Sequence, residues 1–213
     1  HKPLETVVNN ILGTVNILEF SKKYKIKRVI YASSIYSTSV QGGFYRCSKK
    51  AAEDYLEEYY KRYGLNFTIL RYGSLYGLRT DESNGVFKVI KDAIESKKLQ
   101  YFGSRSSIRK YIHVLDAARA TASTISGKYK NKYVNITGTT SHKVTQLIKI
   151  ISKSLRISGK VNYININTNK ANHYIKSPKL FKLRTGINYK LKKSIKFQYG
   201  INSLINCIKK NKI

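Results

Sequence analysis

A strand, a helix and a second strand follow one another between residues 28 and 72, and this order limits the fold more than any other feature of the chain. Residues 28–34 are mainly apolar and end in small hydroxyl side chains. Residues 45–63 carry apolar positions at helical spacing up to Gly64, and residues 66–72 are again mainly apolar. Because this order is typical of α/β proteins, we expect a doubly wound parallel sheet.

Three polar side chains lie at the carboxyl end of the first strand and the start of the helix: Ser34, Tyr45 and Lys49. Tyr45 and Lys49 are four residues apart and share one helical face. We expect the ammonium to lower the pKa of Tyr45 from about 10 by roughly 1–3 units, toward the range of acid–base catalysis. Ser34, rather than Ser33, would hold a substrate oxygen while Tyr45 moves a proton. A chain with 18 tyrosines also produces such a pair by chance.

Five segments of the chain resemble segments of the extended short-chain dehydrogenase/reductases, and they occur in the family's order. This is the family of NAD-dependent nucleotide-sugar epimerases and dehydratases. The five segments are Asn10-x-x-Gly13-Thr14, Ser33-Ser34, Tyr45-x-x-x-Lys49, the stretch from Leu70 to Gly77, and the stretch from Ile108 to Ala118. The resemblance implies an incomplete Rossmann-type sheet with a smaller carboxyl-terminal substrate lobe. Residues 1–77 would form a truncated dinucleotide-binding domain to which residues 109–138 return. Residues 78–213 would mainly form the substrate lobe.

The resemblance also assigns residues to the cofactor. It places Tyr45 and Lys49 against the nicotinamide ribose. It also places Asn10 beside the active site, so the catalytic residues would be Ser34, Tyr45, Lys49 and Asn10. Further cofactor contacts are Ser33, Tyr72 and Gly73. The cofactor would be NAD, with NADP possible. No Gly-x-Gly-x-x-Gly turn occurs in the chain, so the main phosphate-binding site is missing from it. We expect a carboxyl-terminal part of a longer enzyme that lacks roughly the first four strands.

The resemblance places the substrate contacts after residue 73. Arg109 resembles the arginine that clamps the substrate diphosphate, with a surface salt bridge as its alternative. The polar loop from Gly77 to Asn84 would face the substrate, with Gly85 and Val86 of the following helix as substrate contacts, and His173 would belong to a lid. Ser74 is a further substrate contact, although the family usually has asparagine there. His113 and Asp116 match structural positions, the aspartate capping a helix start.

The reaction type follows from the residues after Ser34. Related dehydratases and decarboxylases place carboxylates there, whereas this chain has Ile35 and Tyr36. We therefore expect a nucleotide-sugar epimerase, similar to UDP-glucose 4-epimerase, that works by transient oxidation of a sugar hydroxyl. The alternatives are a reductase or dehydrogenase of the same fold, and a non-catalytic basic remnant or binding protein.

The net charge of +30 suggests nucleic-acid binding at first sight. However, all 11 acidic residues lie at or before Asp116, and the later lysines alternate with Ile, Asn and Tyr. This pattern is typical of an A/T-biased coding sequence, so we expect no nucleic-acid partner. No apolar run is long enough to cross a bilayer, and Cys47 and Cys207 have no metal-ligand spacing. A cytoplasmic location is the default expectation, and the parent enzyme could be a homodimer.

Overall fold

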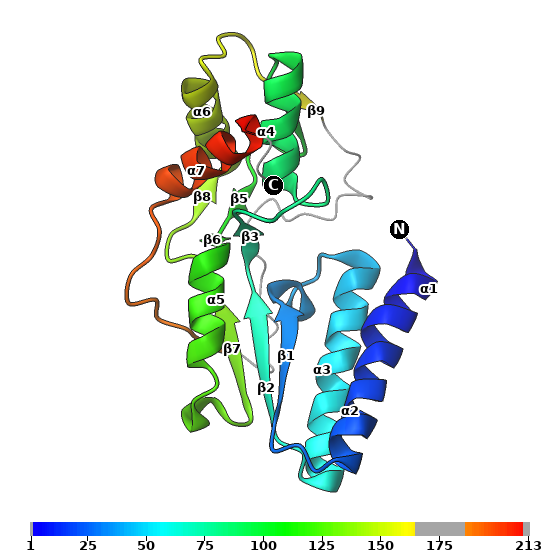
Figure 1. Ribbon diagram of the computed structural model, residues 1–213. Coiled ribbons are helices and arrows are strands. Elements are labelled where there is room, and N and C mark those ends of the chain that lie inside the picture. The colour runs from blue at the N-terminus through cyan, green and yellow to red at the C-terminus, as the bar shows by residue number, and fades with distance from the viewer. Residues whose placement is uncertain (1, 165–185, 211–213) are drawn as a thin grey trace. The chain divides into compact units, whose positions relative to one another are not determined.

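The computed structural model describes residues 2–164 and 186–210. These residues form two compact units, shown as ribbons in Figure 1. Unit 1 contains residues 2–73, 119–137 and 186–189. Unit 2 contains residues 74–118, 138–164 and 190–210. The chain therefore passes from unit 1 to unit 2 after Gly73, four residues before the end of the predicted first domain.

The sheet of unit 1 consists of parallel strands in the order β1-β2-β7-β10. Their bounds are β1 Val29–Ser34, β2 Phe67–Tyr72, β7 Lys132–Ile136 and β10 Ile187–Asn188. Ser34 pairs with Tyr72, and Tyr72 pairs with Ile136. The carboxyl ends of β1, β2 and β7 are therefore level, which is the edge where open α/β sheets bind ligands.

The first helical segments of unit 1 follow one another over residues 3–23. Helix α1 covers Pro3–Thr6 and helix α2 covers Gly13–Lys23, with a π-helical segment, η1, over Val7–Leu12 between them. Helix α3 covers Gly43–Tyr63 and lies beside α2 in Figure 1. Gly64 ends α3 at φ 68°, a left-handed conformation that glycine adopts without strain.

The core of unit 1 lies between these helices and the sheet. Tyr31 and Tyr133 pack at its edge. Its fully or nearly fully buried members are Leu18, Leu56, Tyr59, Leu65, Phe67 and Ile69. Two short 3₁₀ helices complete the unit: η2 over Ile35–Thr38, directly after β1, and η3 over Gly127–Tyr129.

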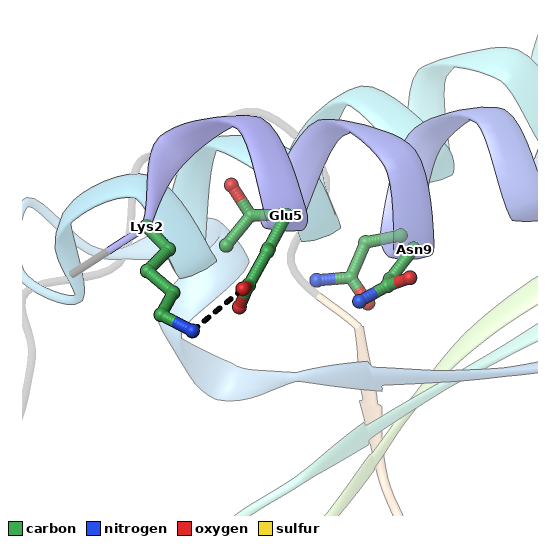
Figure 2. A pocket seen from close by; sticks show the side chains of 5 residues that line it. Lys2, Glu5 and Asn9 are labelled. Atoms are coloured by element: carbon green, nitrogen blue, oxygen red, sulfur yellow. Dashed lines mark hydrogen bonds and ion pairs between the residues drawn. The ribbon is translucent and has the colours of Figure 1, made fainter.

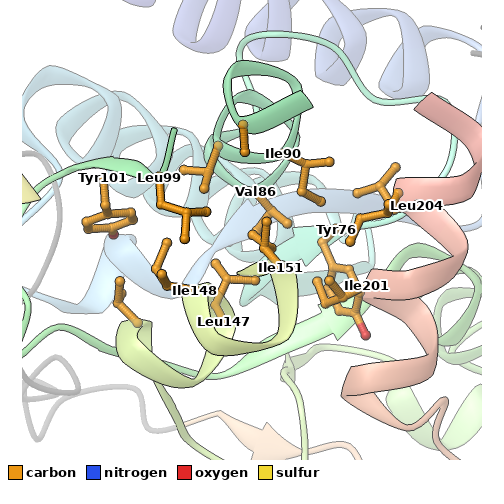
Figure 3. Packing of buried hydrophobic residues seen from close by; sticks show 14 of the residues in the cluster. Tyr76, Val86, Ile90, Leu99, Tyr101, Leu147, Ile148, Ile151, Ile201 and Leu204 are labelled. Carbon is orange, nitrogen blue, oxygen red and sulfur yellow. The ribbon is translucent and has the colours of Figure 1, made fainter. Parts of the chain in front are cut away.

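Unit 2 is built on helices and three pairs of short strands. The pairs are β3 Ser74–Tyr76 with β6 Tyr111–His113, β4 Gln100–Phe102 with β9 Asn162–Ile164, and β5 Ile108–Arg109 with β8 His142–Lys143. The helices are α4 Gly85–Ser96, α6 Val144–Leu155 and α7 Phe197–Lys209. Aliphatic side chains of these helices pack against Tyr76, Leu99 and Tyr101 to form the core shown in Figure 3.

Helix α5 begins earlier than predicted. It covers Val114–Ser123, so Asp116 lies in its first turn and does not cap its start. The side chain of His113 accepts a hydrogen bond from the Leu115 N–H at 3.2 Å. Asp116 instead accepts from the Ile195 N–H at 2.8 Å, which joins two segments of unit 2 that are distant in the sequence.

The helices in the described part of the chain include none with the length and apolar character needed to span a membrane.

Candidate active site

Ser34 and Tyr45 meet at the carboxyl end of β1. Ser34 is the last residue of the strand and is buried. Tyr45 lies in the first turn of α3, where hydrogen bonding with the Ser34 side chain acts to lower the pKa of its hydroxyl. The Tyr45 residue is still 42% exposed, so solvent reaches part of it even though burial affects its hydroxyl. The pair predicted from the sequence is therefore brought together in unit 1.

Lys49 follows one turn later on the same face of α3. Its ammonium donates to the Ala32 carbonyl at 3.0 Å, which directs the side chain toward the end of β1. The ammonium lies 5.1 Å from the centre of the Tyr31 ring and 5.8 Å from that of Tyr45. Burial lowers the pKa of Lys49, while the nearby Glu53 carboxylate raises that pKa.

The structure corrects the predicted effect on Tyr45. Burial raises the pKa of the Tyr45 phenol, and the hydrogen bond from Ser34 works in the opposite direction. The sequence predicted that the Lys49 ammonium would control this pKa. In the structure the ammonium faces a backbone carbonyl and two aromatic rings, so loss of hydration dominates at the phenol.

Asn10 is linked to Tyr45 through the side chain of Ser48. Its amide donates to the Ser48 hydroxyl at 2.9 Å, and that hydroxyl donates to the Tyr45 carbonyl at 3.0 Å. Asn10 occurs in the π-helical segment, and such segments are frequent at functional sites because they redirect side chains. Asn10 and Asn9 line a shallow hollow of about 390 Å³, shown in Figure 2 with Lys2 and Glu5.

Three residues predicted to contact the cofactor have partners within unit 1. The Ser33 hydroxyl donates to the buried Glu53 carboxylate at 2.5 Å. The Tyr72 hydroxyl is 2.5 Å from the Thr121 hydroxyl, and burial raises the pKa of Tyr72. The Gly73 N–H donates to a backbone carbonyl of β7 at 2.9 Å. Their roles in cofactor binding remain predictions.

The predicted substrate residues that the structure describes lie in unit 2. Arg109 is buried, and its guanidinium donates to the Tyr101 hydroxyl at 3.4 Å, so it is not a surface salt-bridge residue. Ser74 begins β3, and Gly85 is exposed at the start of α4. His173 is outside the described residues.

Val86 differs from the prediction. Its side chain is buried in the core of unit 2, and its N–H donates to the Asn84 side chain at 3.0 Å. Asn84 thereby caps α4. The geometry gives Val86 a place in packing and capping, so its contact with substrate remains a prediction without support from its side chain.

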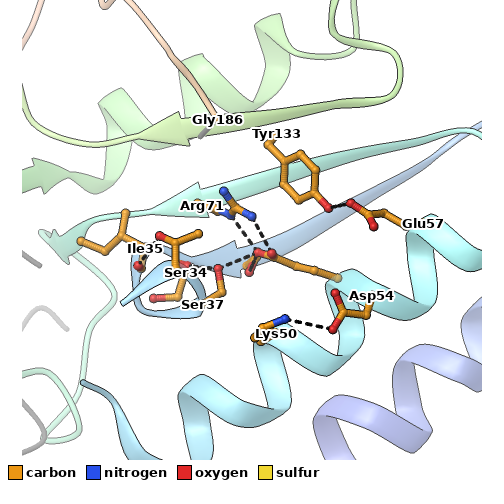
Figure 4. A network of polar contacts seen from close by, with 12 residues as sticks. Ser34, Ile35, Ser37, Lys50, Asp54, Glu57, Arg71, Tyr133 and Gly186 are labelled. Carbon is orange, nitrogen blue, oxygen red and sulfur yellow. Dashed lines mark hydrogen bonds and ion pairs between the residues drawn. The ribbon is translucent and has the colours of Figure 1, made fainter. Parts of the chain in front are cut away.

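Sequence reasoning missed Glu53, Ser37 and Ser48. Glu53 lies eight residues after Tyr45 and four after Lys49, so the same helical periodicity that joined those two residues also indicated Glu53. No comparable pattern indicated Ser37, because its position depends on the turn that follows β1. Figure 4 shows this polar region with Ser34, Ser37 and Arg71 labelled.

Comparison with known proteins shows the family of this chain. Residues 1–137 match the family described as the NAD dependent epimerase/dehydratase family, and the chain belongs to this family. The chain is 30% identical over 171 residues to a putative UDP-glucose 4-epimerase from Methanocaldococcus jannaschii, covering 72% of this chain and 55% of that protein. It is 26% identical over 223 residues to UDP-glucuronate 4-epimerase from Thermodesulfobacterium geofontis, covering 98% of this chain and 68% of that protein. The chain thus spans between about half and two thirds of the length of these relatives.

Solved structures have the same fold. The crystal structure of UDP-glucose 4-epimerase with UDP-glucose from Thermotoga maritima matches with a TM-score of 0.81 and 25% identity, covering 100% of this chain and 73% of that chain. UDP-glucuronic acid 4-epimerase from Bacillus cereus, in complex with UDP-glucuronic acid and NAD, matches with a TM-score of 0.82 and 22% identity, covering 96% and 68%. These likenesses confirm the predicted Rossmann-type α/β class.

Proposed function

We propose that this chain carries the catalytic residues of an NAD-dependent nucleotide-sugar 4-epimerase. The observation that carries the proposal is the meeting of Ser34, Tyr45 and the Lys49 side chain at the carboxyl end of β1. The named relatives support the substrate class, because they include epimerases of UDP-glucose and UDP-glucuronate. UDP-glucose and UDP-glucuronate are therefore the first candidate substrates.

The residues of unit 1 fit the ribose of a nicotinamide cofactor. An ammonium has three N–H donors, and the Ala32 carbonyl receives one of them from Lys49. The others can serve ribose hydroxyls, together with the Tyr45 hydroxyl. When bound, NAD would supply a reversible acceptor for hydride at the sugar carbon, and return of the hydride to the opposite face would invert that carbon.

Tyr45 handles the proton that accompanies this exchange. Because burial raises the pKa of Tyr45, its hydroxyl is protonated at neutral pH and can donate to a sugar carbonyl oxygen. Removing a proton from a sugar hydroxyl requires the phenolate, which the hydrogen bond from Ser34 favours. Ser34 therefore has two tasks: it holds the sugar oxygen and lowers the cost of ionising Tyr45.

Unit 2 supplies the proposed nucleotide contacts. The planar guanidinium of Arg109 suits a diphosphate, since it can donate two parallel hydrogen bonds. Ser74 and Gly85 are the further candidates in this unit. His173 and Val86 remain sequence-based candidates for the same task.

The proposal is tested with the complete gene product. Purified protein is incubated with NAD and either UDP-glucose or UDP-glucuronate, and the sugar products are identified by NMR. We expect the 4-epimer to accumulate to equilibrium without net formation of NADH. An oxidised or reduced sugar formed together with an equal change in NADH would replace the epimerase with a dehydrogenase or reductase. No conversion of either substrate, with no binding of NAD, would support a non-catalytic protein.

A further inference from the structure

Glu53 is a fully buried carboxylate on the face of α3 that carries Tyr45 and Lys49. Its exposed fraction is 1%. A carboxylate is almost never buried to this degree unless its charge is paired and its oxygens are hydrogen bonded. Proton transfer by Tyr45 does not require this group, so its partners indicate what it does.

The partners of Glu53 flank Ser34 in the sequence. The Ser33 hydroxyl donates to its Oε1 at 2.5 Å, and the Ser37 hydroxyl donates to the same oxygen at 2.7 Å. The Ser37 hydroxyl also lies 2.8 Å from the Ser34 carbonyl. One carboxylate is therefore in contact with residues on both sides of Ser34.

Arg71 holds this carboxylate in place from the neighbouring strand. Its Nε and Nη2 donate to the two carboxylate oxygens of Glu53 at 3.0 and 2.7 Å, and its exposed fraction is 1%. The guanidinium carbon lies 4.2 Å from the centre of the Tyr133 ring, a cation–π contact. The bidentate pair and the ring leave the Glu53 carboxylate little freedom to turn.

The negative charge also acts on Lys49. The Glu53 carboxylate raises the pKa of Lys49, against the burial that lowers it. The other titratable groups facing the ammonium are the Tyr31 and Tyr45 phenols, from β1 and α3. Arg71 faces Glu53 from β2.

We propose that Glu53, held by Arg71, is a positioning residue that fixes Ser34 for proton transfer through Ser33 and Ser37. It acts on the position of Ser34 and on the charge of Lys49, and it does not itself contact substrate. This inference rests on the proposed epimerase activity for its catalytic consequence. The positioning itself is a property of the folded chain and can be measured without turnover.

Hydrogen exchange tests the positioning directly. The Tyr36 N–H donates to the Ser34 hydroxyl at 3.2 Å, so the exchange rate of this amide reports where Ser34 lies. Ser37→Ala removes the contacts of this hydroxyl with Glu53 and with the Ser34 carbonyl, and keeps the ion pair of Glu53 with Arg71. We expect Tyr36 exchange to rise roughly fivefold in the complete gene product, the effect of losing one hydrogen bond. Thr38→Ala is the matched control, because its hydroxyl donates to the Ile35 carbonyl and not to Glu53.

Turnover tests the catalytic consequence. We expect Ser37→Ala to lower kcat roughly tenfold with KM nearly unchanged, because a displaced Ser34 affects the reaction more than binding. Thr38→Ala should retain kcat within about twofold. In Glu53→Gln, where it folds, Lys49 loses a stabilising negative charge, so the alkaline limb of the pH profile should move to lower pH.

The outcomes separate the two claims. Unchanged Tyr36 exchange in Ser37→Ala, or an equal rise in Thr38→Ala, overturns the positioning of Ser34 whatever the activity. Altered exchange with unchanged kcat overturns the catalytic role of the network. An unmodified protein that converts no nucleotide sugar overturns the proposed function, while the exchange result still decides the positioning.

Discussion

The first two turns of α3 and its middle differ in how completely their polar groups are bonded. Toward the amino end, Tyr45 is 42% exposed, and Lys49 is only half buried. Two turns on, Glu53 is 1% exposed and accepts hydrogen bonds from Ser33, Ser37 and Arg71. One helix thus presents accessible, perturbed groups in its first turns and a fully buried ion pair at its middle.

This difference indicates that the two parts of the helix have different functions, proton exchange and the positioning of other groups. A group that exchanges protons must keep part of its surface open to a ligand, and its pKa responds to burial. A group that positions others works best when its own bonds are complete and its surroundings are rigid. Variants along this helix should therefore divide into those that change chemistry and those that change stability.

The largest effect is expected from breaking the buried pair. Glu53→Gln leaves the Arg71 guanidinium buried without its counter-charge, which should lower the free energy of unfolding by about 3–5 kcal/mol. Denaturant unfolding of the complete gene product measures this value. Asp54→Asn is the control, because its pair with Lys50 at 3.2 Å is exposed and should be worth at most about 0.5 kcal/mol. Equal losses in the two variants would contradict the comparison.

Removing the proton-transfer group should affect chemistry alone. Tyr45→Phe deletes the hydroxyl but keeps the ring, so we expect turnover to fall by roughly 100-fold or more with little change in nucleotide-sugar affinity. Steady-state kinetics and calorimetric titration with the nucleotide sugar measure the two quantities. Tyr55→Phe, on an exposed part of the same helix, is the control. Near-normal turnover in Tyr45→Phe would show that another group moves the proton.

Lys49 should show a smaller and mixed effect. Lys49→Ala removes the ammonium that lies beside Tyr45 and is proposed to bind the cofactor ribose, so turnover should fall roughly tenfold and NAD affinity should weaken as well. Fluorescence titration with NAD and initial rates measure both. Lys50→Ala, whose partner Asp54 is exposed, serves as control. Loss of turnover with unchanged NAD affinity would remove the proposed ribose contact.

The smallest effect is a shift in pH dependence. The Ser34 hydrogen bond lowers the pKa of Tyr45, so its loss in Ser34→Ala should raise that pKa further. The deprotonated phenol would then become available only at higher pH, and the acid limb of the residual turnover should move upward in pH. Turnover measured as a function of pH in Ser34→Ala and in Thr38→Ala tests this. A downward shift in Ser34→Ala would contradict the assigned hydrogen bond.

The sequence by itself determined the elements and the shared helical face of Tyr45 and Lys49. The apolar β-branched run before Ser34 and the helical spacing that ends at Gly64 predicted β1 and α3 within two residues of their observed bounds. Tyr45 and Lys49 are four residues apart, and this spacing predicted that they share one face of the helix, because helical geometry depends on neighbours in the chain. These predictions depended on neighbours in the chain, and the structure confirms them.

Only the tertiary structure decided the environment of these groups. The pKa of Tyr45 is raised because burial outweighs the expected effect of Lys49, and burial depends on how α3 packs against β1. Asp116 and Val86 likewise have partners, Ile195 and the core of unit 2, that no local pattern indicates. The role of Glu53 could be inferred only from its buried ion pair with Arg71, which lies eighteen residues away in the sequence. Desolvation and ion pairing are properties of the folded chain.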